Sequence, residues 1–103
     1  MTQFDKAIRD KIPKIIKESG KNCNVKKLTD SEFLTQLEKK LVEELSEYQE
    51  SKNVEELADI LEVIYRISEL KGITSDELDS IKNEKAKKRG KFDDNLFLVD
   101  SDK

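Results

Sequence analysis

The sequence predicts an all-α protein, a small antiparallel bundle of about four helices, from its composition and from its helix start and stop signals. Charged residues make up 42% of the chain and hydrophobic residues 35%, a balance typical of amphipathic helices that share a narrow core. Four phenylalanines, two tyrosines, no tryptophan and three glycines argue against a β-sandwich. We expect one domain over residues 1–103, whose limited apolar content is completed by oligomerisation.

Local signals place the four helices, which we expect over residues 13–19, 31–49, 54–70 and 75–90. Pro13 suits the first turn of a short helix. Thr29 and Glu32 have the spacing of a capping box, and so do Thr74 and Glu77. These pairs predict the starts of the second and fourth helices.

The connections between these helices differ in length. Residues 21–28 show no periodic pattern and are expected to be irregular. Asn53 is expected to cap the third helix after a link of a few residues around 50–52, which makes the second and third helices antiparallel neighbours. Gly72 provides the next stop. An apolar tail, expected to pack on the bundle or on a partner, comprises Phe92, Leu96, Phe97, Leu98 and Val99.

The composition also excludes several functions. No histidine is present, which excludes Ser-His-Asp chemistry, Cys-His nucleophilic pairs and His-ligated zinc. The net charge of −3 gives no general attraction for nucleic acid, so no nucleic-acid polymer is expected as a partner. Cys23 is the single cysteine, and no apolar run approaches the roughly 18 residues that span a bilayer. We therefore expect a cytoplasmic protein with no membrane partner.

Two acidic pairs lie along the apolar sides of the second and third predicted helices. Glu44 and Glu47 are three residues apart, as are Glu56 and Asp59, and this spacing puts both members of a pair on one face. The short link brings the pairs to the same end of the bundle, where four carboxylates would repel one another. A divalent cation would remove that cost, and oxygen-only ligands favour Mg²⁺, with Mn²⁺ as a substitute. These four side chains are the predicted metal ligands.

A second interpretation of Glu56 is open at this point. It follows Asn53 by three residues, so its side chain could instead close a capping box. Other acidic residues of the same two helices are interpreted as a solvated face: Glu43, Glu50, Glu55 and Glu62.

Basic residues near both ends of the chain are candidates for phosphate binding. Lys88 and Arg89 end the fourth predicted helix, although basic residues also complement the helix dipole there. Arg9 and Lys11 present the same choice, and an ion pair between Arg9 and Asp10 is the structural alternative.

Three sequence blocks follow one another in order and cover nearly the whole chain: residues 9–13 (RDKIP), 56–63 (ELADILEV) and 88–92 (KRGKF). Together with the ExxE…ExxD arrangement of the acidic pairs, they resemble the MazG-like all-α nucleoside triphosphate pyrophosphohydrolases. That superfamily also contains dimeric dUTPases and phosphoribosyl-ATP pyrophosphohydrolase, and the blocks are most similar to a compact branch of house-cleaning pyrophosphatases. The eight residues between Glu47 and Glu56 form a shorter gap than in many of these relatives.

The resemblance implies Mg²⁺-dependent hydrolysis of a nucleoside triphosphate to the monophosphate and pyrophosphate. It also implies a homodimer or larger homo-oligomer, since relatives build their sites from more than one chain. Because histidine is absent, Glu47 is the expected general base, and with Glu44 it forms the predicted catalytic pair. Two alternatives stay open: a non-catalytic helical interaction module, and a phosphoribosyl-ATP pyrophosphohydrolase.

Overall fold

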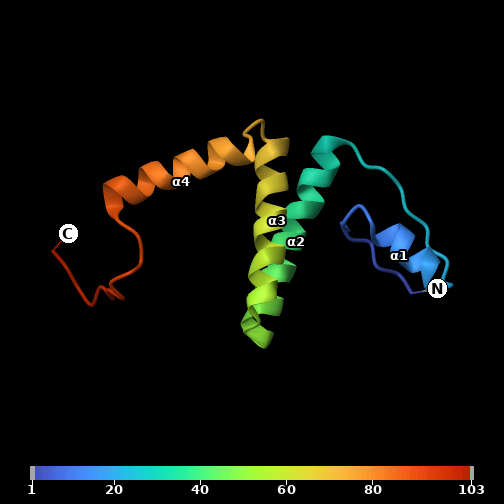
Figure 1. Cartoon of the computed structure of the whole chain (residues 1–103), viewed down its shortest axis with the longest axis horizontal. Helices are drawn as coiled ribbons and strands as arrows, with labels where there is room; N and C mark the ends of the chain where they lie inside the picture. Colours follow the sequence, from blue (N-terminus) through green and yellow to red (C-terminus); the bar gives the residue numbers. More distant parts are fainter. Residues whose placement is uncertain (1, 103) are drawn as a thin grey trace.

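A computed structural model of the protein describes residues 2–102. Over these residues it contains four helices and no β-strand, which confirms the all-α prediction. The helices are α1 (Ile12–Glu18), α2 (Asp30–Ser51), α3 (Val54–Leu70) and α4 (Ser75–Arg89) (Figure 1). Within the described part of the chain, no helix is both long and apolar enough to cross a membrane.

Both predicted capping boxes are formed, and they determine where α2 and α4 begin. The Thr29 hydroxyl accepts a hydrogen bond from the Glu32 amide at 3.2 Å, and the Glu32 carboxylate accepts one from the Thr29 amide at 3.0 Å. The hydrogen bonds from Thr29 lower the pKa of Glu32 because they favour its ionised form. Thr74 and Glu77 form the same arrangement at the start of α4.

The link between α2 and α3 is shorter than predicted, because α2 continues to Ser51. Lys52 ends α2 in the left-handed region of backbone conformation, with φ of 60°. The Asn53 side chain then caps α3 by accepting a hydrogen bond from the Glu55 amide at 3.0 Å. This two-residue link turns α3 back along α2, so that the two helices form an antiparallel hairpin (Figure 1).

The core lies between α2 and α3 and is closed by the segment that precedes α1. Leu37 of α2, Val63 of α3 and Ala7 are its buried hydrophobic residues. Ala7 belongs to residues 2–11, which we call the N-terminal strap. Partly buried side chains packed on this core are Phe33, Leu41, Ile67 and Leu70. The strap is therefore held against the hairpin by a buried methyl group.

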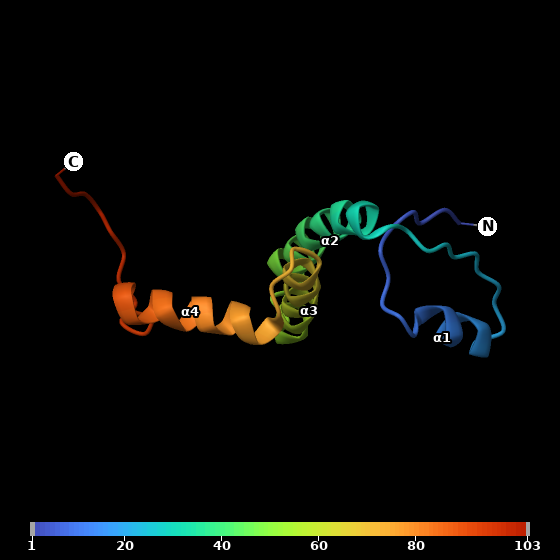
Figure 2. The same ribbon diagram turned by 90° about the horizontal axis from the view of Figure 1, so that it is seen from above.

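The fourth helix and the tail do not return to the hairpin. Figures 1 and 2 show α4 projecting from one side of the α2–α3 pair, while the strap and α1 lie on the other side. Gly72, with φ of 86°, lies at the turn between α3 and α4. The apolar side chains of the tail, from Phe92 to Val99, are 78–98% exposed. The prediction that the tail packs on its own bundle is therefore wrong, and packing on a partner stays a prediction.

The chain is more extended than a compact domain of its length. Its radius of gyration is 18.0 Å, whereas about 13 Å is expected for a compact domain of this size. Its accessible surface is 9475 Å², against about 6,000 Å² expected from its mass. Helical periodicity places several exposed apolar residues on the side of the hairpin opposite Glu44, Glu56 and Asp59. We call this side the open face, and it comprises Val42, Leu45, Leu57 and Leu61. Coverage of the open face by a second copy stays a prediction.

We expect the protein to self-associate through the open face. Leu61→Lys should raise the dissociation constant at least about tenfold, because it removes apolar burial and adds a charge at the interface. Sedimentation equilibrium measures this, after circular dichroism has established that the variant is helical. Glu62→Gln is the matched control, since Glu62 is an exposed neighbour on α3 and its loss changes the net charge equally. A monomeric wild type at high micromolar concentration, or equal association of all three proteins, would contradict this account.

Candidate metal centre

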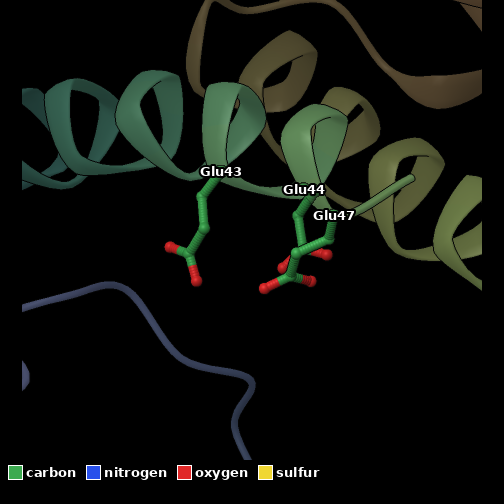
Figure 3. Close-up of side chains that lie close together, drawn as sticks. All are labelled: Glu43, Glu44 and Glu47. Carbon is green, nitrogen blue, oxygen red and sulfur yellow. The ribbon is translucent and has the colours of Figure 1, made fainter. Parts of the chain in front are cut away.

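Carboxylates of α2 and α3 converge in the half of the hairpin nearest the link. Glu44, Glu56 and Asp59 each offer an oxygen that lies within 4.8 Å of the other two. Glu43, Glu44 and Glu47 form a second such group, so Glu44 belongs to both. Figure 3 shows the three α2 side chains pointing to one side of the helix, toward the dark blue N-terminal strap. The structure thus brings the four predicted ligands and Glu43 into two groups that share Glu44, and we call the two groups together the acidic cluster.

Glu44 is the buried member of the cluster, with 6% of its surface exposed. Its Oε1 lies 3.4 Å from Lys40 Nζ, one helical turn earlier, whereas its Oε2 is buried without a hydrogen-bond partner in the described chain. Burial raises the pKa of Glu44, and the charges of Glu47 and Asp59 add to this effect while Lys40 opposes it.

This raised pKa affects stability in a defined direction. Above the ordinary pKa of 4.5 the unfolded chain releases the Glu44 proton first. Ionisation of Glu44 therefore costs native-state stability as the pH rises through this region. A cation placed at the unpartnered oxygen would offset that cost.

Two basic side chains of the strap reach the cluster. Arg9 Nη2 donates a hydrogen bond to Asp59 Oδ1 at 2.7 Å. Lys6 Nζ lies 3.4 Å from Glu43 Oε1. Arg9 thus pairs with a residue of α3. The alternative prediction, an ion pair between Arg9 and Asp10, is wrong.

The capping-box interpretation of Glu56 is also wrong. The Asn53 amide donates its hydrogen bond to Ser51 Oγ at 3.1 Å, and the Asn53 side chain caps the Glu55 amide. Over residues 2–102, the Glu56 carboxylate takes part in no hydrogen bond or ion pair, although it is half-buried. Its position among the other carboxylates therefore has no explanation in helix capping.

Three further residues belong to the site. Glu43, predicted to be solvated, is half-buried in the cluster because the strap covers its side of α2. Lys40 could have been found from its i, i+4 spacing to Glu44. Lys6 could not, because its partner lies 37 positions along the chain and no local pattern connects them.

The four predicted phosphate-binding residues lie on two sides of the molecule. Arg9 is at the cluster, and Lys11 follows it with an exposed side chain at the start of α1. Lys88 and Arg89 line an open hollow of about 400 Å³ along one face of α4. Figure 2 shows the C-terminal end of α4 on the side of the hairpin away from the strap. One chain therefore does not bring Lys88 and Arg89 to the acidic cluster. Their contact with phosphate stays a prediction that requires a second chain.

The cluster fits a hard divalent cation. Its donors are carboxylate oxygens, the ligand type that Mg²⁺ and Mn²⁺ prefer. Ligands held at about 2.1 Å from Mg²⁺ lie roughly 3–4 Å apart, so oxygens already within 4.8 Å need only small side-chain movements. Glu44 Oε2 adds a buried oxygen with no hydrogen-bond partner among the described residues, so the fit does not depend on exposed acids alone.

Comparisons of this chain with protein-family models, curated proteins and solved structures find no match. The resemblance to the MazG-like enzymes therefore rests on the three sequence blocks and the acidic pairs, and membership of that superfamily stays a prediction. The class that the geometry itself supports is a helical protein with a candidate divalent-cation centre on an α-hairpin.

We expect Mg²⁺ or Mn²⁺ to raise the melting temperature, because the ligands converge only in the folded hairpin. A cation at ten times its dissociation constant adds about 1.4 kcal/mol, and 1 kcal/mol corresponds to roughly 4–8 °C for a domain of this size. Calorimetry in EDTA and in MgCl₂ measures the shift. Glu44→Gln should abolish it, while Glu62→Gln, outside the cluster, should retain it. An equal shift in Glu44→Gln would show that the cation binds elsewhere.

Proposed function

We propose that the protein is a cytoplasmic, Mg²⁺-dependent pyrophosphohydrolase that converts a nucleoside triphosphate, with an ordinary or a modified base, to the monophosphate and pyrophosphate. The proposal rests on the convergence of Glu44, Glu56 and Asp59, together with the buried Oε2 of Glu44, which has no hydrogen-bond partner among residues 2–102. The resemblance of the three sequence blocks to MazG-like enzymes supplies the reaction class.

The residues of the cluster have two roles in this reaction, cation binding and proton transfer. A bound divalent cation would neutralise phosphate charge and make the attacking water more acidic. Glu44, Glu56 and Asp59 would hold that cation. Glu47 is exposed beside Glu44 and takes part in no ion pair of residues 2–102, so it accepts the proton of the water that attacks the α-phosphorus. The bond from the α-phosphorus to the bridging oxygen breaks, and pyrophosphate leaves.

The remaining phosphate contacts come from basic residues of two chains. Arg9 and Lys11 lie on the strap side of the cluster in the same chain. Lys88 and Arg89 reach the cluster of a second chain in a homodimer or larger homo-oligomer. The open face and the exposed apolar tail support such an assembly, because both leave large apolar side chains in water.

The non-catalytic interaction module is the less favoured alternative. It requires the acidic residues to serve as helix caps and solvated surface. Glu56 is not a cap, and Glu44 is buried rather than solvated. A phosphoribosyl-ATP pyrophosphohydrolase would use the same cluster, so only the substrate distinguishes it from the proposed function.

We expect the purified protein to release pyrophosphate and a nucleoside monophosphate from at least one triphosphate in the presence of Mg²⁺. Glu56→Gln should lower kcat by about 100-fold or more, because it removes a ligand of the catalytic cation. Glu55→Gln is the matched control, since this neighbouring carboxylate is exposed outside the cluster. The measurement is product analysis by anion-exchange chromatography across a panel of ordinary and modified triphosphates and phosphoribosyl-ATP.

Each outcome of this assay distinguishes the candidate functions. Activity on phosphoribosyl-ATP alone would assign the protein to the alternative reaction. Absence of hydrolysis with both Mg²⁺ and Mn²⁺, for every substrate of the panel, would contradict the proposed function and favour the interaction module. Equal activity of the Glu55 and Glu56 variants would show that Glu56 is not a ligand of the catalytic cation.

A further inference from the structure

The ion pair between Arg9 and Asp59 connects the strap to the candidate metal centre. It is the shortest ion pair among the described residues, at 2.7 Å, and a single Nη2 contacts a single Oδ1. The two side chains are 55% and 40% exposed, so solvent reaches both partners. Exposed pairs of this kind contribute little free energy and are easily broken.

The guanidinium group of Arg9 and a divalent cation bound at the cluster would compete for the carboxylate of Asp59. Asp59 is one of the three residues whose oxygens lie within 4.8 Å of one another, and it also accepts the hydrogen bond of Arg9. A divalent cation bound by Asp59 would lie within a few ångströms of the guanidinium group, where like charges repel strongly. Arg9 therefore neutralises Asp59 in the cation-free protein and is repelled when a cation binds.

The two other basic residues of the cluster, Lys40 and Lys6, are less suited to such an exchange. Lys40 pairs with Glu44 from the same helix, and its side chain is only 17% exposed. Lys6 pairs with Glu43, which lies outside the group formed by Glu44, Glu56 and Asp59. Arg9 is thus the one basic residue of the described chain that is both exposed and bound to a member of that group.

The strap keeps Arg9 near the cluster after its ion pair breaks. Ala7, two residues earlier, is buried against Leu37 and Val63. Two residues of extended chain span at most about 7 Å, so the guanidinium group can turn away from Asp59 without leaving the site. A planar guanidinium group released beside a bound cation is well placed to bind phosphate oxygens.

We propose that Arg9 exchanges partners: it neutralises Asp59 in the cation-free protein, gives Asp59 up to the divalent cation, and then binds a phosphate group of the cation–phosphate complex. This inference rests on the proposed function, because it requires the acidic cluster to bind a divalent cation. It predicts that one substitution has opposite effects on two ligands. A purely structural role of Arg9 would not produce opposite effects.

The test compares wild type with Arg9→Gln, Arg9→Lys and Lys21→Gln by isothermal titration calorimetry. The probes are MnCl₂ alone and the manganese–pyrophosphate complex. Arg9→Gln should bind Mn²⁺ roughly two- to fivefold more tightly than wild type, the range expected from losing an exposed ion pair. It should bind manganese–pyrophosphate about tenfold more weakly, because a charge-assisted contact is lost.

The control variants separate specific from general charge effects. Arg9→Lys keeps the charge and should lie between wild type and Arg9→Gln for both probes. Lys21→Gln removes an exposed charge from the same part of the chain that makes no ion pair in the described residues, so it should match wild type. Circular dichroism establishes that every variant is helical.

The outcomes distinguish failure of the exchange from failure of the proposed function. If wild type binds no Mn²⁺, the acidic cluster is not a metal centre, and both the proposed function and the exchange are contradicted. If wild type binds Mn²⁺ but Arg9→Gln binds it equally or more weakly, the exchange is wrong and the centre stands. If Arg9→Gln binds Mn²⁺ more tightly but manganese–pyrophosphate equally well, Arg9 only neutralises Asp59 and the exchange is likewise overturned.

Discussion

The buried carboxylate of Glu44 lies among side chains of its own charge, and the surrounding structure limits the cost of this arrangement. Lys40 compensates one oxygen of Glu44 from within α2, and the strap brings Arg9 to the neighbouring Asp59. One oxygen of Glu44 is left buried and without a partner in the described chain. Buried charges of this kind are costly unless they are paired or bind a metal. The candidate metal centre and the proposed reaction both depend on this carboxylate.

The two-residue link at Lys52 and Asn53 gives the hairpin two chemically different sides. Because α3 returns directly along α2, the acidic residues of both helices converge on one side, and the opposite side is the open face formed by Val42, Leu45, Leu57 and Leu61. An association surface on the open face would leave the acidic cluster accessible to substrate. The small core, whose buried hydrophobic residues are Ala7, Leu37 and Val63, explains why such association would also stabilise the fold.

Local signals in the sequence predicted the helices well and their arrangement less completely. Thr29–Glu32 and Thr74–Glu77 predicted two helix starts because capping is decided within four residues. The i, i+3 spacing and the short link placed the four carboxylates together for the same reason. The partner of Arg9 lies 50 positions away, so no spacing rule could find it. The exposure of the tail was missed because apolar residues in a sequence do not indicate whether the surface that covers them lies in the same chain, and the tail side chains are 78–98% exposed.

The most direct test of this account is the position of a divalent cation in a crystal of the protein grown with MnCl₂, located by its anomalous scattering. The account predicts an anomalous peak within about 2.3 Å of carboxylate oxygens of Glu44, Glu56 and Asp59, the Glu44 ligand being Oε2, with Arg9 turned away from Asp59. A well-ordered cluster without a peak, in which Arg9 still contacts Asp59, would contradict it.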